Sequence, residues 1–245
     1  MFLSSNPIGN MLNLTGEITE SGEQNDLIRM YTKRHIQKTI EHYTPFLKKL
    51  EKRYSVPVPF IQAVLHQEME GMDLLDPIAD LVVRRNLSNT VKKHPKGMLP
   101  DGYEKANRFH PLRKMDSSTG YAQIYAFVAI NAINFAVAED LTSYEKLGIP
   151  ADHTLHPRKI KDLWLIWRRL NREPKFNIEI ATLNLLSAAK EKTGKLDFAG
   201  YTPEEIKRIY TRYNGTSSTI TEYGEEAYRY YQYYSNLSSN SGYAP

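Results

Sequence analysis

The pattern of apolar and polar positions predicts a chain built from helices. Apolar side chains recur every three or four residues over long stretches, and the sequence contains no alternating strand pattern of useful length and no internal repeat. Pro45 is expected to divide the first helical stretch in two, because proline lacks the amide hydrogen that a helix interior needs. The predicted helices cover residues 26–54, 60–68, 77–85, 120–138, 163–170, 177–191, 203–213 and 222–234.

These elements predict a mainly α protein with a polar segment at each end. Residues 1–25 are expected to form a flexible leader and residues 236–245 a flexible tail, because both are rich in small polar side chains. Residues 26–54 are expected to form a helical N-terminal extension to the main domain, which covers residues 55–235. Within that domain a long polar connection over residues 86–119 contains several prolines and glycines, a composition typical of functional loops.

The composition excludes several classes of protein. The chain has 245 residues and no cysteine, so disulfides and thiolate metal sites are excluded and the fold depends on its apolar core. No signal peptide is visible, because the sequence turns polar directly after Met1-Phe2-Leu3. The most apolar stretch, residues 121–138, includes Gln123 and two asparagines, so we expect a buried helix there and no membrane span.

The charge of the chain is mildly basic and spread along the sequence. A formal net charge of +4 permits attraction to an anionic polymer but does not indicate nucleic acid, and the sequence has no nucleic-acid recognition motif. A basic helical protein that binds nucleic acid stays open as an alternative, and its affinity would fall steeply with salt. We expect no cofactor and no metal, since His153 and His156 have helical spacing but no evident third ligand.

Glu68 carries the strongest chemical signal in the sequence. It follows Ile61, Val64 and Leu65 at helical spacing, so its carboxyl group is directed toward the apolar stripe of the predicted helix. Burial disfavours the charged form of a carboxyl group and raises its pKa. A carboxylic acid that stays protonated in a partly apolar pocket is the general acid that glycosidases use. The alternative is an exposed or capped side chain in the last turn of the helix.

Two later segments place polar groups near helix ends. Gly120 stands in a polar turn before a buried helix, and Gln123 falls in the first turns of that helix, where its amide can hydrogen-bond a ligand. Asn214 and Gly215 end another helix with residues that suit a left-handed cap, which puts Tyr213 at the rim of the face this helix covers. Each segment is equally consistent with local structure alone, an N-cap in the first case and a helix stop in the second.

Taken together and in this order, the segments resemble the lysozyme-like superfamily, and within it the soluble lytic transglycosylases and goose-type lysozymes. Residues 56–68 are similar to that family's helix ending in the catalytic glutamate, and residues 118–124 to its Gly-x-x-Gln segment that lines the glycan groove. Residues 176–181 resemble the Asn-Ile start of a later helix, and residues 213–215 the Tyr-Asn segment near the sugar. The resemblance covers residues 50–235 or so.

The resemblance implies a lysozyme-like, transglycosylase-type helical domain that cleaves the β-1,4 bond between N-acetylmuramic acid and N-acetylglucosamine. Glu68 would act as general acid and base. A lytic transglycosylase needs only this carboxyl group, whereas a hydrolase needs a second, for which Asp116 is the first candidate. The alternatives to Asp116 are Asp73, Asp76 and Asp80. The residues expected to bind substrate are Gly120, Tyr121, Gln123, Tyr125, Tyr213, Asn214 and Tyr230.

The expected partner is therefore the glycan strand of peptidoglycan, and the expected place of action is the bacterial cell wall, in the periplasm or outside the cell, by an unknown export route. The chain departs from the family pattern, because Met69 and Glu70 follow the glutamate where the family usually has serine, and because Gly215 comes one position early. These departures favour the rival hypothesis of a non-catalytic lysozyme-like module that binds peptidoglycan or has a structural role.

Overall fold

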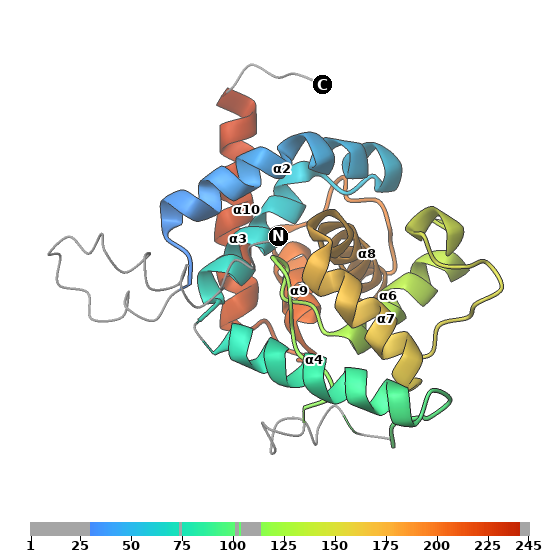
Figure 1. Cartoon of the computed structure of the whole chain (residues 1–245). Helices are drawn as coiled ribbons and strands as arrows, with labels where there is room; N and C mark the ends of the chain where they lie inside the picture. The colour runs from blue at the N-terminus through green and yellow to red at the C-terminus, as the bar shows by residue number, and fades with distance from the viewer. Residues whose placement is uncertain (1–29, 74, 101–102, 104–113, 241–245) are drawn as a thin grey trace, which may run out of the picture.

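The structure of the chain is a computed structural model that describes residues 30–73, 75–100, 103 and 114–240 (Figure 1). These ranges are mainly α, as the sequence predicted. Pairing of extended backbone within them is limited to two isolated bridges, Met98 with Lys159 and Thr119 with Ile124. The helices are α2 (Lys33–Tyr54), α3 (Val58–Gly71), α4 (Asp76–Lys93), α6 (Ala126–Ala138), α7 (Ile160–Arg172), α8 (Pro174–Thr193), α9 (Pro203–Asn214) and α10 (Glu222–Asn240), with a short 3-10 helix, η3, at Glu145–Leu147.

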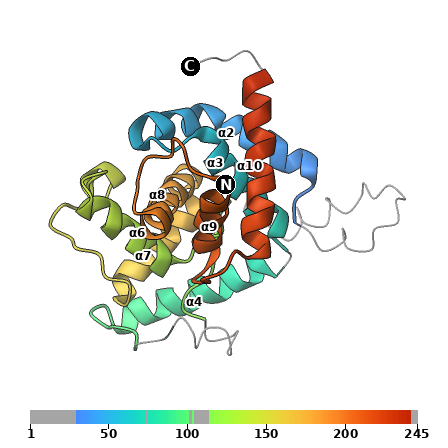
Figure 2. The ribbon, with the colours of Figure 1, turned by 180° about the vertical axis from the view of Figure 1, so that it is seen from behind.

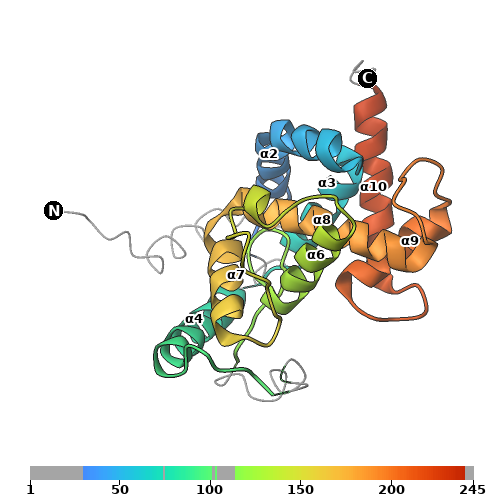
Figure 3. The ribbon, with the colours of Figure 1, turned by 90° about the vertical axis from the view of Figure 1, so that its right-hand side faces the viewer.

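Helix α8 is the centre of the fold. It packs against α2, α3, α6, α7 and α9, and Figure 3 shows α7 and α9 on opposite sides of it. Buried side chains follow one another along the helix, as in Ile180-Ala181-Thr182-Leu183, so every face is covered. A helix with apolar side chains on all sides is stable only when other elements cover each side, and α8 therefore lies in the core.

Helix α3 lies between α2 and α10, and it also contacts α8 (Figure 2). Pro59 stands in the first turn of α3, where a missing amide hydrogen costs no hydrogen bond. Buried residues of α2 belong to the same core as those of α3 and α8. The helical segment at the N-terminal side of the chain therefore covers the domain that carries Glu68.

The prediction that Pro45 divides the first helical stretch is wrong, because α2 continues through it from Lys33 to Tyr54. Pro45 is exposed, so the carbonyl group that it leaves unpaired one turn earlier faces solvent. Pro45 interrupts the backbone hydrogen bonds of α2. The hydroxyl of Thr44 donates an additional hydrogen bond to the Ile40 carbonyl oxygen, at 2.9 Å. The tertiary contacts of Ile36 and Leu47 then hold both halves against the core.

Other boundaries also differ from the prediction. The segment 120–125 forms a turn, and α6 begins only at Ala126, because positive φ angles at Gly120 and Gln123 are incompatible with a helix. Helix α4 extends to Lys93, and α10 continues to Asn240 through the first part of the expected tail. Within the ranges described, no helix combines the length and the apolar character needed to cross a membrane.

Gly224 allows the beginning of α10 to lie directly on α9. A Cβ atom at this position would come within 2.2 Å of the Thr211 hydroxyl oxygen and 2.7 Å of the Lys207 carbonyl oxygen. The hydroxyl can rotate away, but the carbonyl belongs to the backbone of α9 and can move only with that helix. The close approach therefore sets the distance between α9 and the first turn of α10.

We expect Gly224→Ala to lower the free energy of unfolding by about 1–3 kcal/mol, the usual cost of an extra methyl group in a tightly packed contact. Urea denaturation of both proteins measures the change. Gly215→Ala is the matched control, because a Cβ atom there meets nothing within 4 Å and its φ of 179° suits any residue. Stabilisation by Gly224→Ala, as helix propensity alone would give, would contradict the close contact.

Candidate active site

Glu68 lines a pocket of about 370 Å³ that is formed by segments distant from one another in the sequence. The last turns of α3, the first turn of α4 and the 118–125 turn contribute to it, as do α6, α8, the end of α9 and the first turn of α10. The residues that line it are Gln67, Glu68, Gly71, Asp76, Ser118, Gln123, Ile124, Tyr125, Val128, Asn184, Tyr213, Asn214 and Tyr223.

The carboxyl group of Glu68 is held by Tyr223 from the first turn of α10. The phenolic O–H donates to Glu68 Oε1 at 2.6 Å. Burial raises the pKa of Glu68 to about 8, the Tyr223 hydrogen bond opposes that rise, and the nearby charge of Asp76 adds to it. Glu68 is therefore protonated at neutral pH, as the sequence analysis expected for a general acid.

Tyr223 donates in this contact. Burial, together with the nearby Glu68 carboxyl, raises the tyrosine pKa well above its ordinary value, so the phenol keeps its proton. Because Oε1 of Glu68 accepts this hydrogen bond, the acidic proton belongs on Oε2. The arrangement leaves one defined oxygen of the carboxylic acid available as a proton donor.

Asn177 of α8 holds the turn that carries Gln123. Its side-chain oxygen accepts from the Ala122 N–H at 2.8 Å, and its side-chain NH₂ donates to the Thr119 carbonyl oxygen at 2.9 Å. Gly120 has a φ of +73°, and a Cβ atom there would lie 2.5 Å from the Asn177 amide nitrogen. Gly120 thus has a conformational role beside the pocket, whereas Gln123 lines it and donates to the Gly120 carbonyl oxygen at 2.9 Å.

The end of α9 is tied to the same turn. The Tyr213 hydroxyl donates to the Ala122 carbonyl oxygen at 3.0 Å, and burial, together with the Glu68 carboxyl, raises the pKa of this tyrosine well above its ordinary value. Asn184 of α8 donates to the Tyr213 carbonyl oxygen at 3.4 Å. Tyr213 and Asn214 both line the pocket, so the segments 118–125 and 213–214, which the sequence analysis singled out, meet beside Glu68.

Of three tyrosines expected to bind substrate, one lines the pocket and two lie outside its lining. Tyr125 lines the pocket and exposes 38% of its surface. Tyr121 lies outside the pocket lining and packs its ring against Tyr43, with 5.8 Å between ring centroids. Tyr230 also lies outside it, stacks on His66 at 3.9 Å between centroids and donates a hydrogen bond to Glu70.

The structure does not bring Asp116 to the pocket. This carboxyl group is fully buried and accepts from the N–H groups of Ala126 and Phe127 at 2.9 and 3.0 Å, so it satisfies the first free amides of α6. Burial raises its pKa to about 7, and the backbone hydrogen bonds oppose that rise. The contacts give Asp116 a structural role at the helix start, and we assign it no catalytic step.

Among the alternative carboxyl groups, Asp76 is the one that lines the pocket. Its side chain accepts from the Asp73 N–H at 2.9 Å, and burial raises its pKa above the ordinary value. Asp80 accepts from the hydroxyls of Ser117 and Thr119, both at 2.7 Å. Asp80 therefore helps to fix the turn before Gly120.

The two candidate metal-binding histidines have other partners. His153 Nε2 lies 2.7 Å from Asp162 Oδ1, and His156 Nδ1 accepts from the Arg158 N–H at 3.1 Å. The described residues contain no group of three or more His, Asp or Glu side chains that could hold a metal ion.

Sequence analysis missed Tyr223 and Asn184. Tyr223 comes 155 residues after Glu68 and shares no local pattern with it, so only the packing of α10 on α3 reveals the contact. Asn184 had a detectable signal, since it is a polar side chain between apolar residues of the central helix.

Comparison with known proteins gave no match, either to a protein-family model, to a curated protein or to a solved structure.

We expect Glu68→Gln to change the pH dependence of stability. A carboxyl group whose pKa rises from 4.5 to about 8 on folding destabilises the native state increasingly as pH rises between these values. The amide has no such cost, so the stability of the variant relative to the original protein should grow by up to about 1.4 kcal/mol per pH unit. The difference should level off above pH 8. Urea denaturation across this range measures it, with Glu222→Gln on the exposed surface of α10 as the matched control.

We expect Tyr223→Phe to raise the pKa of Glu68 further, because the lost hydrogen bond favours the charged form. A neutral hydrogen bond contributes about 1 kcal/mol, so the rise should be roughly 0.7 of a pH unit. Titration of the glutamate carboxyl carbons by NMR measures the shift. Tyr228→Phe, on the same helix but outside the pocket, is the control, and an unchanged Glu68 titration in Tyr223→Phe would contradict the assigned contact.

Proposed function

We propose that this protein is a glycosidase that cleaves the glycan strands of peptidoglycan between N-acetylmuramic acid and N-acetylglucosamine, with Glu68 as general acid. The observation that carries the proposal is a carboxyl group with a pKa of about 8, held by Tyr223 at the wall of a pocket. Residues of the segments 118–124 and 213–215, which resemble the glycan-binding motifs of lysozyme-like enzymes, line the same pocket.

The lining suits a sugar that carries hydroxyl and N-acetyl groups. Gln123, Asn184 and Asn214 present amides, which both donate and accept hydrogen bonds. The exposed ring of Tyr125 offers an apolar face against which a pyranose ring can pack. A pocket with a few convergent polar groups around one titratable residue with a perturbed pKa is a typical binding site for a small polar ligand.

In the proposed reaction, the Oε2 proton of Glu68 passes to the glycosidic oxygen as the bond from the anomeric carbon of muramic acid breaks. The leaving sugar departs as an alcohol, and the positive charge that develops on the muramyl ring faces the new Glu68 carboxylate. In a lytic transglycosylase this carboxylate then takes the proton of the muramyl 6-hydroxyl, whose oxygen closes onto the anomeric carbon. Glu68 ends the cycle protonated, and no second carboxyl group takes part.

A hydrolase needs another carboxylate to position water or to stabilise the cation. Asp76 is the candidate that the pocket supports, because it lines the pocket and its charge raises the pKa of Glu68. The two chemistries therefore differ in what they require of Asp76, and the products distinguish them. A substrate in the cell wall places the proposed action in the periplasm or outside the cell.

The test is digestion of purified peptidoglycan, with mass spectrometry of the released muropeptides. We expect release by the original protein, a loss of roughly 10²–10⁴-fold in Glu68→Gln, and unchanged release by Glu222→Gln. Activity should decline as pH rises through about 8, because Glu68 then loses the proton that it must donate.

The nature of the products assigns the reaction. Products ending in 1,6-anhydromuramic acid, with activity kept in Asp76→Asn, identify a lytic transglycosylase. Reducing ends, with activity lost in Asp76→Asn, identify a muramidase. Absence of products from several types of cell wall contradicts the proposal and favours a lysozyme-like module that binds peptidoglycan without cleaving it.

A further inference from the structure

Helix α4 has an outer face whose apolar side chains are exposed in the part of the chain that the structure describes. Leu75, at its N-terminal boundary, exposes 66% of its surface, Ile78 exposes 56% and Leu81 exposes 62%. These residues follow one another at intervals of three, so they lie along one side of the first two turns. Single exposed leucines are common, but three adjacent ones on one helix face indicate a binding surface.

The second half of the same face is basic. Arg85 and Lys92 continue the stripe that Ile78 and Leu81 begin, and Lys93 lies beside it in the last turn. All three are exposed, and none forms an ion pair with any residue in the described ranges. The outer face of α4 thus changes from apolar to cationic along its length.

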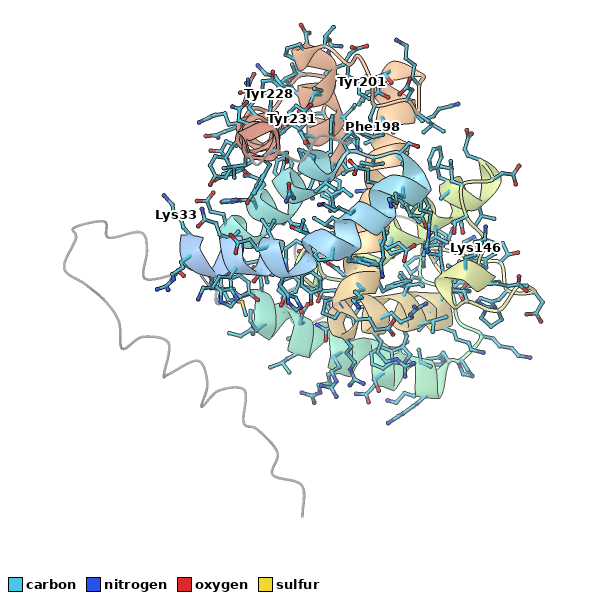
Figure 4. All side chains as sticks on the ribbon, turned by 90° about the horizontal axis from the view of Figure 1, so that it is seen from above. Lys33, Lys146, Phe198, Tyr201, Tyr228 and Tyr231 are labelled. Atoms are coloured by element: carbon cyan, nitrogen blue, oxygen red, sulfur yellow. The ribbon has the colours of Figure 1, made fainter. Side chains whose placement is uncertain are left out.

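Both acidic residues of α4 point to the other side of the helix. Asp76 lines the active-site pocket, and Asp80 accepts hydrogen bonds from Ser117, Thr119 and Asn171. The inner face, with Val83 buried, packs mainly against α7. Figure 4 shows α4 along the edge of the molecule opposite the labelled Tyr201 and Tyr228. No negative charge of α4 therefore offsets the cations of its outer face.

We propose that the outer face of α4 binds an anionic lipid surface. Apolar side chains on one helix face with lysine and arginine beside them are what a helix needs to lie in the headgroup region of a bilayer. Leu75, Ile78 and Leu81 enter the boundary between headgroups and acyl chains, and Arg85 and Lys92 contact lipid phosphates. The helix lies on the membrane without crossing it.

Charge and chemistry favour lipid over two other occupants. A second copy of this chain, docked through the same face, would place the basic half of α4 against either the basic or the apolar half of its partner, and neither arrangement pairs the cations with anions. A soluble anionic polymer would use Arg85 and Lys92 but would leave Ile78 and Leu81 exposed to water. A membrane surface accommodates both halves of the face. Since Asp76 is in the first turn of α4, docking also brings the pocket close to the membrane.

Sedimentation with vesicles tests the proposal without any activity assay. We expect the full chain to bind vesicles of phosphatidylcholine mixed with phosphatidylglycerol and not vesicles of phosphatidylcholine alone. The pair Arg85→Glu with Lys92→Glu should weaken binding at least about tenfold, since each basic residue near an anionic surface contributes about 1 kcal/mol. The pair Ile78→Ser with Leu81→Ser should also weaken it about tenfold or more, through lost apolar burial.

The matched control changes the same charge on another helix. Lys38 and Lys49 are exposed on α2, and the pair Lys38→Glu with Lys49→Glu lowers the net charge as much as the α4 pair does. We expect this control to weaken binding much less than the α4 pair at physiological salt, where charges away from the contact are screened. Circular dichroism of each variant confirms that it is folded before vesicles are added.

A fluorescent label distinguishes insertion from adsorption. The chain has no cysteine, so Leu81→Cys provides a single attachment point for an environment-sensitive dye. Mixed anionic vesicles should shift its emission to the blue, while the same dye at Lys49→Cys on α2 should keep its aqueous spectrum.

Three outcomes would overturn the proposal. The first is no binding to anionic vesicles. The second is equal weakening by the α2 and α4 charge pairs, which would mean diffuse attraction. The third is binding that is unaffected by Ile78→Ser with Leu81→Ser, accompanied by no blue shift at position 81 and by binding to soluble heparin. That result would assign the face to an anionic polymer.

Discussion

The placement of one carboxyl group between α3 and α10 is the constraint on which the site depends. Glu68 is partly withdrawn from water at the wall of the pocket, and its carboxyl group accepts a hydrogen bond from the Tyr223 hydroxyl at 2.6 Å. The contact requires the first turn of α10 to lie close to the end of α3. Gly224 makes this possible, because the next residue after Tyr223 adds no side chain between α10 and α9. The hydrogen bond to Glu68 therefore depends on how closely the backbone of α10 approaches α9.

Buried amides of α8 connect the core to the rest of the pocket. Asn177 holds the 119–122 backbone with both ends of its side chain, and Asn184 reaches the carbonyl group of Tyr213 at the end of α9. A buried polar group is stable only when it is hydrogen-bonded. Each of these amides bonds to the backbone of a loop, and the hydrogen bonds hold that loop in position. Because both come from the most deeply packed helix, the two loops that line the pocket take their positions from the rigid centre of the fold.

Sequence patterns could predict the parts of this structure that depend on local spacing. The helices, the burial of Ile61, Val64 and Leu65 in α3 and the place of Glu68 near its end follow from intervals between apolar residues. Tyr223 could not be found this way, because its role arises from the packing of α10, 155 residues later. Pro45 was misjudged because its effect depends on which side of α2 faces solvent. Asp116 was expected near the reaction, but the sequence gives no sign that it would meet the first amides of α6.

Two carboxyl groups line the pocket, those of Glu68 and Asp76, and they differ in how deeply they are buried. Burial raises the pKa of both carboxyl groups above their ordinary values, and Asp76 is the less buried of the pair. Its negative charge then makes ionisation of Glu68 still less favourable. When Asp76 is charged, the pair therefore favours the state in which Glu68 keeps its proton. An acid-catalysed cleavage of a glycosidic bond requires a protonated carboxylic acid, and the packing that buries Glu68 beside Tyr223 favours that form of Glu68.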